Sequence, residues 1–164
     1  MAELARVAVA EVRTAVPSGL GVEAGMMVLR EEGEPHRTLR IIMAQPEARA
    51  IYAAWHATLP VRPSTWDLFV SAIALLEGRI DRAVITAVEQ ERHFFAAIEL
   101  EHAGQRRTIS CRPSDAVALA LRAHGAEIFA DEEVLAAAGR LADGTKPPAP
   151  QPPAPQPPQL PDSG

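Results

Sequence analysis

The residues best suited to chemistry stand where the chain passes from a strand-like segment into a helix. The clearest case is Arg112-Pro113-Ser114-Asp115, which follows the β-like run 106–111 and precedes an alanine- and leucine-rich segment. A proline at the first helical position leaves Ser114 and Asp115 in the first turn, where free backbone N–H groups attract anions. Ordinary helix capping explains these residue types as well as a binding or catalytic corner does.

Acidic and basic residues also begin two other predicted helices. Glu47 and Arg49 follow Pro46, and Asp67 lies three residues after Ser64, a spacing that resembles a capping box. Carboxylates can hold a divalent metal ion that activates water, and arginine can bind the charge of a phosphate group. On this chemistry the candidate catalytic residues are Glu47, Asp67, Ser114 and Asp115, the candidate phosphate contacts are Arg49 and Arg112, and the candidate ligands for Mg²⁺ or Mn²⁺ are Glu47, Asp67 and Asp115. For each carboxylate, helix capping remains an equally good explanation.

The elements that must position these residues follow from hydrophobic periodicity. The pattern predicts strands over 6–13, 25–30, 38–43, 79–88, 93–101 and 105–111. Helices are predicted from 47 to before Pro60, from 64 to Gly78, from 113 to Gly125 and over 134–138. The two halves have the same order, three strands and then two helices, which predicts an α+β fold with an internal duplication.

Composition restricts the class of protein. The chain has 164 residues, 48% of them apolar, and a formal net charge of -5, which argues against a general nucleic-acid coat protein. A local basic patch remains compatible with that charge, and its candidates are Arg37, Arg40, Arg106 and Arg107. The single cysteine, Cys111, cannot form an internal disulfide, so a reducing compartment is expected.

The ends of the chain differ in character. The first residues do not resemble a signal peptide, and no apolar run approaches the roughly 20 residues that cross a bilayer, so we expect a cytoplasmic protein with no membrane contact. Near the other end, proline-rich low-complexity sequence follows Thr145. This composition predicts a folded domain over 1–140 and a disordered tail over 141–164.

Four stretches in this order resemble the bifunctional nuclease domain family. They are IIMAQPEARAI at 41–51, RPSTWDL at 62–68, CRPSDAVALALR at 111–122 and IFADEEVL at 128–135. The resemblance implies an α+β domain in which a duplicated unit of three strands and two helices forms one curved, barrel-like mixed sheet flanked by helices. It also implies assembly into homo-oligomers and hydrolysis of both RNA and DNA.

The chain departs from the family's pattern at two positions. Trp66 stands where the family usually has His, and Ser110 stands where it often has Asp. A general base and a metal ligand are therefore both replaced. Two functions stay open: a metal-assisted nuclease of low sequence specificity (DNase and RNase), and a catalytically degenerate oligomeric binding or regulatory domain of the same fold.

Overall fold

The computed structural model describes residues 3–17, 23–58, 60–90 and 92–146. Its first half is an antiparallel meander followed by two helices, as the hydrophobic pattern predicts. These elements are β1 (Leu4–Pro17), β2 (Glu23–Glu31), β3 (Thr38–Ala44), α1 (Gln45–Trp55) and α2 (Thr65–Leu75). Residues 147–164 of the predicted tail lie outside the described residues, so the division at 140/141 stays a prediction.

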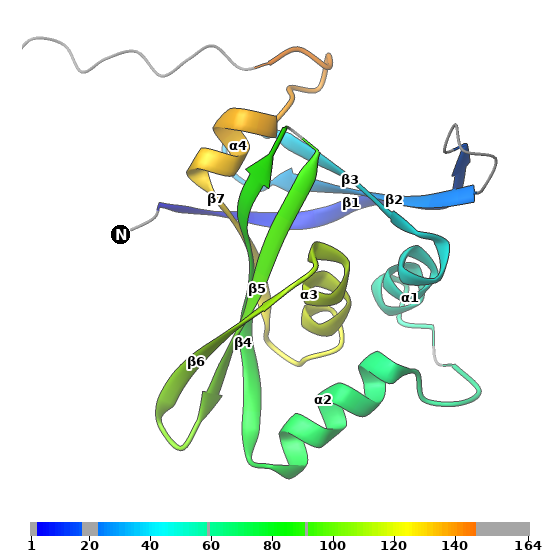
Figure 1. Cartoon of the computed structure of the whole chain (residues 1–164), viewed down its shortest axis with the longest axis vertical. Coiled ribbons are helices and arrows are strands. Elements are labelled where there is room, and N and C mark those ends of the chain that lie inside the picture. Colours follow the sequence, from blue (N-terminus) through cyan, green and yellow to red (C-terminus); the bar gives the residue numbers. More distant parts are fainter. Residues whose placement is uncertain (1–2, 18–22, 59, 91, 147–164) are drawn as a thin grey trace, which may run out of the picture.

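The second half begins with another antiparallel meander and has one more strand than the first. Its elements are β4 (Gly78–Glu89), β5 (His93–His102), β6 (Gln105–Cys111), α3 (Pro113–Ala120), β7 (Glu127–Asp131) and α4 (Glu132–Ala138), shown in Figure 1. Because β7 lies between α3 and α4, the order of elements is not a simple copy of the first half. The duplication therefore stays a prediction.

All seven strands of the described residues form one mixed sheet in the order β3-β2-β1-β7-β4-β5-β6. The late strand β7 joins the two meanders, because it pairs antiparallel with β1 and parallel with β4. The α+β prediction is confirmed. The expected barrel-like curvature is wrong, since the sheet is open with β3 and β6 at its edges. Helices α1 and α3 contact one another, and each packs on a different half of the sheet.

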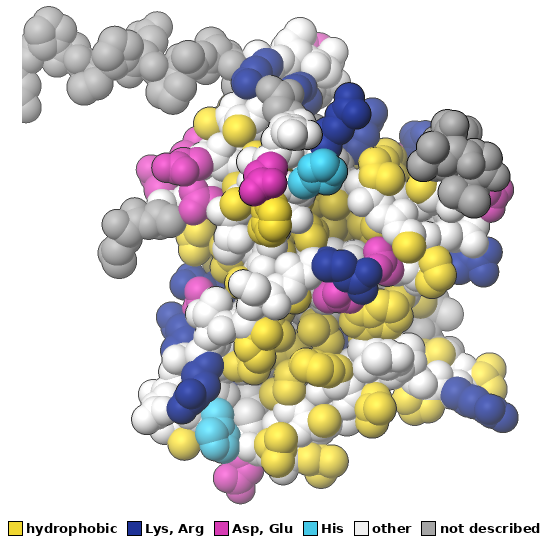
Figure 2. All heavy atoms as spheres, in the orientation of Figure 1, with side chains coloured by type: hydrophobic (Ala, Val, Ile, Leu, Met, Phe, Trp, Pro, Cys, Tyr) yellow, Lys and Arg dark blue, Asp and Glu magenta, His cyan; other side chains and the backbone are white. Residues whose placement is uncertain are grey.

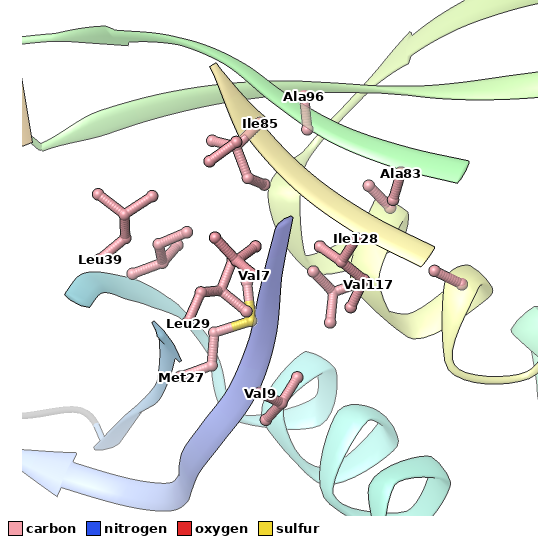
Figure 3. Packing of buried hydrophobic residues seen from close by; sticks show 14 of the residues in the cluster. Val7, Val9, Met27, Leu29, Leu39, Ala83, Ile85, Ala96, Val117 and Ile128 are labelled. Atoms are coloured by element: carbon pink, nitrogen blue, oxygen red, sulfur yellow. The ribbon is translucent and has the colours of Figure 1, made fainter. Parts of the chain in front are cut away.

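The core forms because apolar residues alternate along the strands. In β3, for example, Leu39, Ile41 and Met43 are buried while Arg40 and Ile42 are exposed. The buried residues make one continuous cluster. Figure 3 shows part of this cluster, with side chains from the strands and from α3.

The helix α3 lies at the centre of this core. Seven of its eight residues are buried, and it starts at Pro113 immediately after β6 ends. Close packing also fixes α1, since any Cβ added at Gly25 of β2 would collide with Ala48 of α1. The two helices that begin at the strand ends are therefore held rigidly.

The helix α2 is different, because none of its residues is buried. Its N-terminus is well defined: Asp67 N donates to Ser64 Oγ at 3.4 Å, and Ser64 N donates to Asp67 Oδ2 at 2.7 Å. The predicted capping box is thus confirmed. None of the helices in the described ranges is long and apolar enough to cross a membrane.

Arg37 does not belong to the predicted basic patch, because it is buried in an ion-pair network. Its guanidinium donates to Glu31 at 2.6 Å and to Glu132 of α4 at 2.6 Å. Burial alone raises the pKa of Glu31, but the hydrogen bonds and charge of Arg37 outweigh it and hold that pKa below its usual value. This network ties α4 to the β2–β3 hairpin.

Candidate functional site

The two strand-to-helix corners meet at Arg112. Its Nε donates to Asp115 Oδ2 at 2.8 Å, and its Nη2 lies 3.2 Å from Asp115 Oδ1. Its Nη1 forms an ion pair with Glu47 Oε1 from the other corner. The structure therefore brings together Glu47, Arg112 and Asp115, from α1 and α3, which we call the corner cluster.

Each member of the corner cluster lies at the N-terminal end of a helix, and that helix positions it. Glu47 is buried and accepts from the backbone N–H of Ala44, the residue before α1, at 3.1 Å. Asp115 lies in the first turn of α3, immediately after the buried Pro113 and Ser114. Arg112 precedes α3 and keeps 66% of its side chain exposed. The cluster thus presents one exposed guanidinium between two carboxylates on a rigid base.

The charges of the corner cluster stabilise one another. Hydrogen bonding to Asp115, with the charge of that residue and of Glu47, raises the pKa of Arg112. The guanidinium stays protonated at any working pH in any case. A phosphate group that reaches it must therefore compete with the carboxylates for its N–H groups.

Trp66 and Asp67 connect α2 to this arrangement. The indole Nε1 of Trp66 donates to Asp115 Oδ1 at 3.3 Å, and the guanidinium carbon of Arg122 lies 5.9 Å from the Trp66 ring centroid. Asp67 Oδ1 accepts from Arg122 Nε at 2.9 Å. Asp67 is therefore linked to the corner cluster through Trp66 and Arg122 rather than by a shared ligand.

Arg122 is a residue that sequence reasoning did not identify as part of the site. Its Nη1 donates to the carbonyl of Ala118 at 2.9 Å, and its Nη2 donates to the carbonyl of Ala50 at 3.0 Å. Together with the Asp67 contact, these bonds join α1, α2 and the end of α3. The only available signal was its place at the end of the 111–122 motif.

The two remaining candidates lie at the margins of the cluster. Ser114 is only 4% exposed, so it belongs to the packed base of α3 rather than to the open surface. Arg49 is exposed on α1 and makes no ion pair within the described part of the chain. Of these two, Arg49 is the better placed to meet a ligand from solvent.

The predicted metal site requires the carboxylates of Glu47, Asp67 and Asp115 to face one ion. No group of three or more His, Cys, Asp or Glu side chains in the described residues is arranged to hold a metal ion. The carboxylates of Glu47, Asp67 and Asp115 are instead occupied by arginine, serine, tryptophan or backbone donors. This arrangement does not fit a metal ion held by all three, and metal assistance stays a prediction.

Cys111, next to Arg112, is not suited to act as a nucleophile. Burial, and then the negative charge of Asp115, raise the pKa of its thiol above the usual value. Because the thiolate is the reactive form, this environment favours an unreactive thiol. The chemistry available at the corner is therefore that of carboxylate and guanidinium groups.

A hollow of about 400 Å³ opens beside this arrangement, between the end of α1, α2 and the end of α3. Asp67 and Arg122 form part of its wall, together with Ser71 and His124. Trp66 contacts both Arg122 of this wall and Asp115, so the hollow is linked to the corner cluster through Arg122 and Trp66.

Comparison with known proteins supports the resemblance seen in the four stretches. The model of the bifunctional nuclease domain matches residues 27–142, which include both corners, Trp66 and Arg122. Two proteins from Mycobacterium tuberculosis, of strains CDC 1551 / Oshkosh and ATCC 25618 / H37Rv, are each 37% identical over 115 residues. The alignment covers 70% of this chain and 67% of each relative, and both relatives are described as uncharacterized. Because the family match covers more than half of the chain and includes both corners, this chain belongs to the bifunctional nuclease domain family.

Proposed function

We propose that this protein is a nuclease of low sequence specificity that hydrolyses phosphodiester bonds of RNA and DNA at the corner cluster. The observation that carries the proposal is Arg112, an exposed guanidinium that bridges Glu47 and Asp115. Guanidinium binds phosphate through two parallel hydrogen bonds. The geometry of Arg112 toward Asp115, with contacts from both Nε and Nη2, already has this form.

The reaction begins with an exchange of partners at Arg112. A substrate phosphate takes the N–H groups that Glu47 and Asp115 hold in the free protein. The carboxylates released in this way become available to accept a proton from water. A new bond forms between that water oxygen and phosphorus, the bond to the leaving sugar oxygen breaks, and solvent supplies the proton for the leaving oxygen.

Recognition by Arg112 involves the phosphate and no base edge, which is why low sequence specificity is expected. Arg49 adds a second positive charge on the same side of α1 as the hollow. The tryptophan at position 66 has a positioning role here, because its indole N–H holds Asp115 Oδ1 at 3.3 Å. Asp67 acts on the corner only through Arg122 and Trp66.

The proposal is tested by cleavage of single-stranded RNA and DNA, in Mg²⁺, in Mn²⁺ and in chelator. The informative variant is Arg112→Met, and the matched control is Arg13→Met, which removes an exposed arginine paired with Glu11 on β1. We expect wild type and the control to cleave alike and Arg112→Met to lose at least about 100-fold in rate, the scale of removing one transition-state donor. Equal cleavage by Arg112→Met would contradict the proposed site, and the chelator arm shows whether a metal ion takes part.

A second candidate function is favoured by the surface of α2. This is the alternative of a binding or regulatory domain that assembles into homo-oligomers. Large apolar side chains remain exposed on and near α2, and in Figure 2 they gather between α2 and β6. The large exposed apolar residues on α2, at its C-terminal end and on β6 include Leu68, Phe69, Leu75, Leu76 and Ile109. Contiguous apolar surface of this kind marks interaction sites.

We propose that a second copy of the chain covers this surface, whichever function holds. Within the described residues β6 pairs only with β5, so its other edge offers free backbone groups. An antiparallel β6–β6 pairing centred on Thr108 would set Arg107 opposite Ile109 and Arg106 opposite Ser110, with no like charges facing each other. Light scattering of wild type beside Leu75→Glu tests this: loss of the oligomer in the variant supports it, and a wild-type monomer at 100 μM contradicts it.

A further inference from the structure

We infer that the hollow beside Trp66 is a subsite for one unpaired nucleobase of the substrate. This inference rests on the proposed nuclease function, and it adds that single strands are preferred to duplexes. The hollow has a volume of about 400 Å³, within the range of small-molecule sites. The chemistry of its walls decides what it accepts.

The α1 wall of the hollow is built from methyl groups. Ala53 and Ala54 of α1 line it, together with Ala57 two residues after the helix ends. A wall of small apolar side chains suits the flat face of an aromatic ring. His124, exposed at the end of α3, supplies a planar ring at the same hollow, and such rings stack on bases without regard to sequence.

The opposite wall is polar and can bind the edge of a base. Arg122 uses three N–H groups, toward Asp67, Ala118 and Ala50. A guanidinium has five N–H groups, so two remain for a carbonyl or ring nitrogen of a base. The Ser71 hydroxyl, which donates to the Asp67 carbonyl at 2.8 Å, keeps its oxygen lone pairs as acceptors. Both donors and acceptors therefore line one side of the hollow.

The position of the hollow relative to charge fits a nucleotide rather than an isolated ring. Arg49 lies four residues before Ala53, so these two residues share one face of α1. Arg49 thus carries an exposed cationic group on the face of α1 that includes the wall residue Ala53. The wall residue Arg122 contacts the Trp66 ring, and the indole N–H of Trp66 donates to Asp115 of the corner cluster. A base in the hollow is therefore linked through two contacts to the corner cluster that is proposed to bind the phosphate.

A base enters such a hollow only when it is unpaired and unstacked. In a duplex substrate the base pair must first open, which costs on the order of a few kcal/mol per base. Single-stranded RNA or DNA avoids most of this cost. The subsite therefore predicts faster cleavage of single strands while leaving sequence specificity low, because stacking is tolerant of base identity.

The test is calorimetric titration of the full chain with AMP, UMP, ribose 5-phosphate and inorganic phosphate. We expect both nucleotides to bind at least about 10-fold more tightly than ribose 5-phosphate, since base stacking contributes about 1–3 kcal/mol. Two variants, Ser71→Leu and Ala53→Leu, fill the hollow from different helices. The matched control is Ala72→Leu, at an exposed position of α2 next to Ser71 but outside the hollow.

The outcomes separate this inference from the proposed function. Loss of the nucleotide preference in both filling variants, with the control unchanged, supports the subsite. If wild type binds AMP no better than ribose 5-phosphate, the inference is overturned even when RNA is cleaved. If nucleotides bind but wild type cleaves nothing, the subsite stands and hydrolysis is what fails. In an active enzyme, Ser71→Leu should raise KM for single strands several-fold and leave kcat within about 2-fold, since the filled subsite binds ground state and transition state alike.

Discussion

Helices α2 and α3 are both rich in apolar residues and contact each other, yet their environments are opposite. Seven of the eight residues of α3 are buried, whereas α2 has no buried residue among its eleven. The helix α3 is surrounded by β4, β5, β7, α1 and α2, and α2 contacts mainly β4 and α3. Composition therefore does not decide burial here; the number of packed neighbours does.

Because their burial differs, the two helices have different proposed roles. Because α3 is fixed in the core, Arg112 and Asp115 at its N-terminal end are held in a defined geometry. The helix α2 is anchored at its start by Ser64, Asp67 and Arg122, which leaves the rest of its apolar surface open. The buried helix builds the proposed site, and the exposed helix supplies the proposed interface.

The largest expected effect on stability comes from truncating a leucine of α3, and the same truncation on α2 serves as the comparison. Leu119→Ala on α3 should lower the free energy of unfolding by about 3 kcal/mol, because it leaves a cavity in a packed core. Leu75→Ala on α2, where the side chain is 85% exposed, should change it by less than about 0.5 kcal/mol in the monomer. Urea unfolding at low protein concentration measures both. Similar losses for the two variants would contradict the comparison.

A smaller effect is expected when the anchor of α2 is removed. Arg122→Met keeps much of the side-chain volume but deprives Asp67 and two backbone carbonyls of their donor. We expect a loss of about 2 kcal/mol, below the 3–5 kcal/mol typical of fully buried pairs, because 28% of the Asp67 side chain is exposed. Faster hydrogen exchange in α2 than in α3 should accompany it. The control Arg40→Met, at an exposed position of β3, should change stability by less than about 0.5 kcal/mol.

The smallest effect concerns pH. Burial alone raises the pKa of Asp67, but hydrogen bonds from Ser64 and then from Arg122 outweigh it, so that pKa lies below its usual value. A lowered pKa stabilises the fold above the unfolded-state value of about 3.9, and this contribution is lost as the pH falls through the folded-state pKa. Thermal unfolding between pH 3 and pH 7 should therefore show a shallower acid loss in Asp67→Asn than in wild type. Glu133→Gln, at an exposed position of α4, is the control, and parallel profiles for wild type and Asp67→Asn would contradict the assignment.

Local patterns predicted those parts of the fold that local physics determines. The alternation in β3 gave its buried face, and Pro46 and Pro113 marked helix starts. The Ser64–Asp67 spacing predicted a capping box that the structure contains. In each case the partners lie within a few residues, so the interaction is visible in the sequence.

Long-range partners could not be predicted in the same way. Arg37 was assigned to a surface patch, but Glu132, one of the two carboxylates that pair with it, is distant in sequence. Arg122 meets Asp67 and Ala50 only after three helices have packed. The apolar residues of α2 give no local sign that none of its residues is buried. The open sheet likewise depends on β7, which pairs with both β1 and β4. No local residue pattern predicts these two pairings.

If Glu47 and Asp115 perform chemistry rather than only cap their helices, replacing both carboxylates must slow cleavage. The most direct measurement is the single-turnover cleavage rate of single-stranded RNA by the double variant Glu47→Gln/Asp115→Asn, with its unfolding midpoint matched to wild type. Both replacements keep side-chain shape and a carbonyl acceptor while removing the basic carboxylates. We expect a loss of at least about 100-fold, the lower end of the range for general acid–base catalysis. A folded double variant that cleaves as fast as an active wild type would contradict the claim.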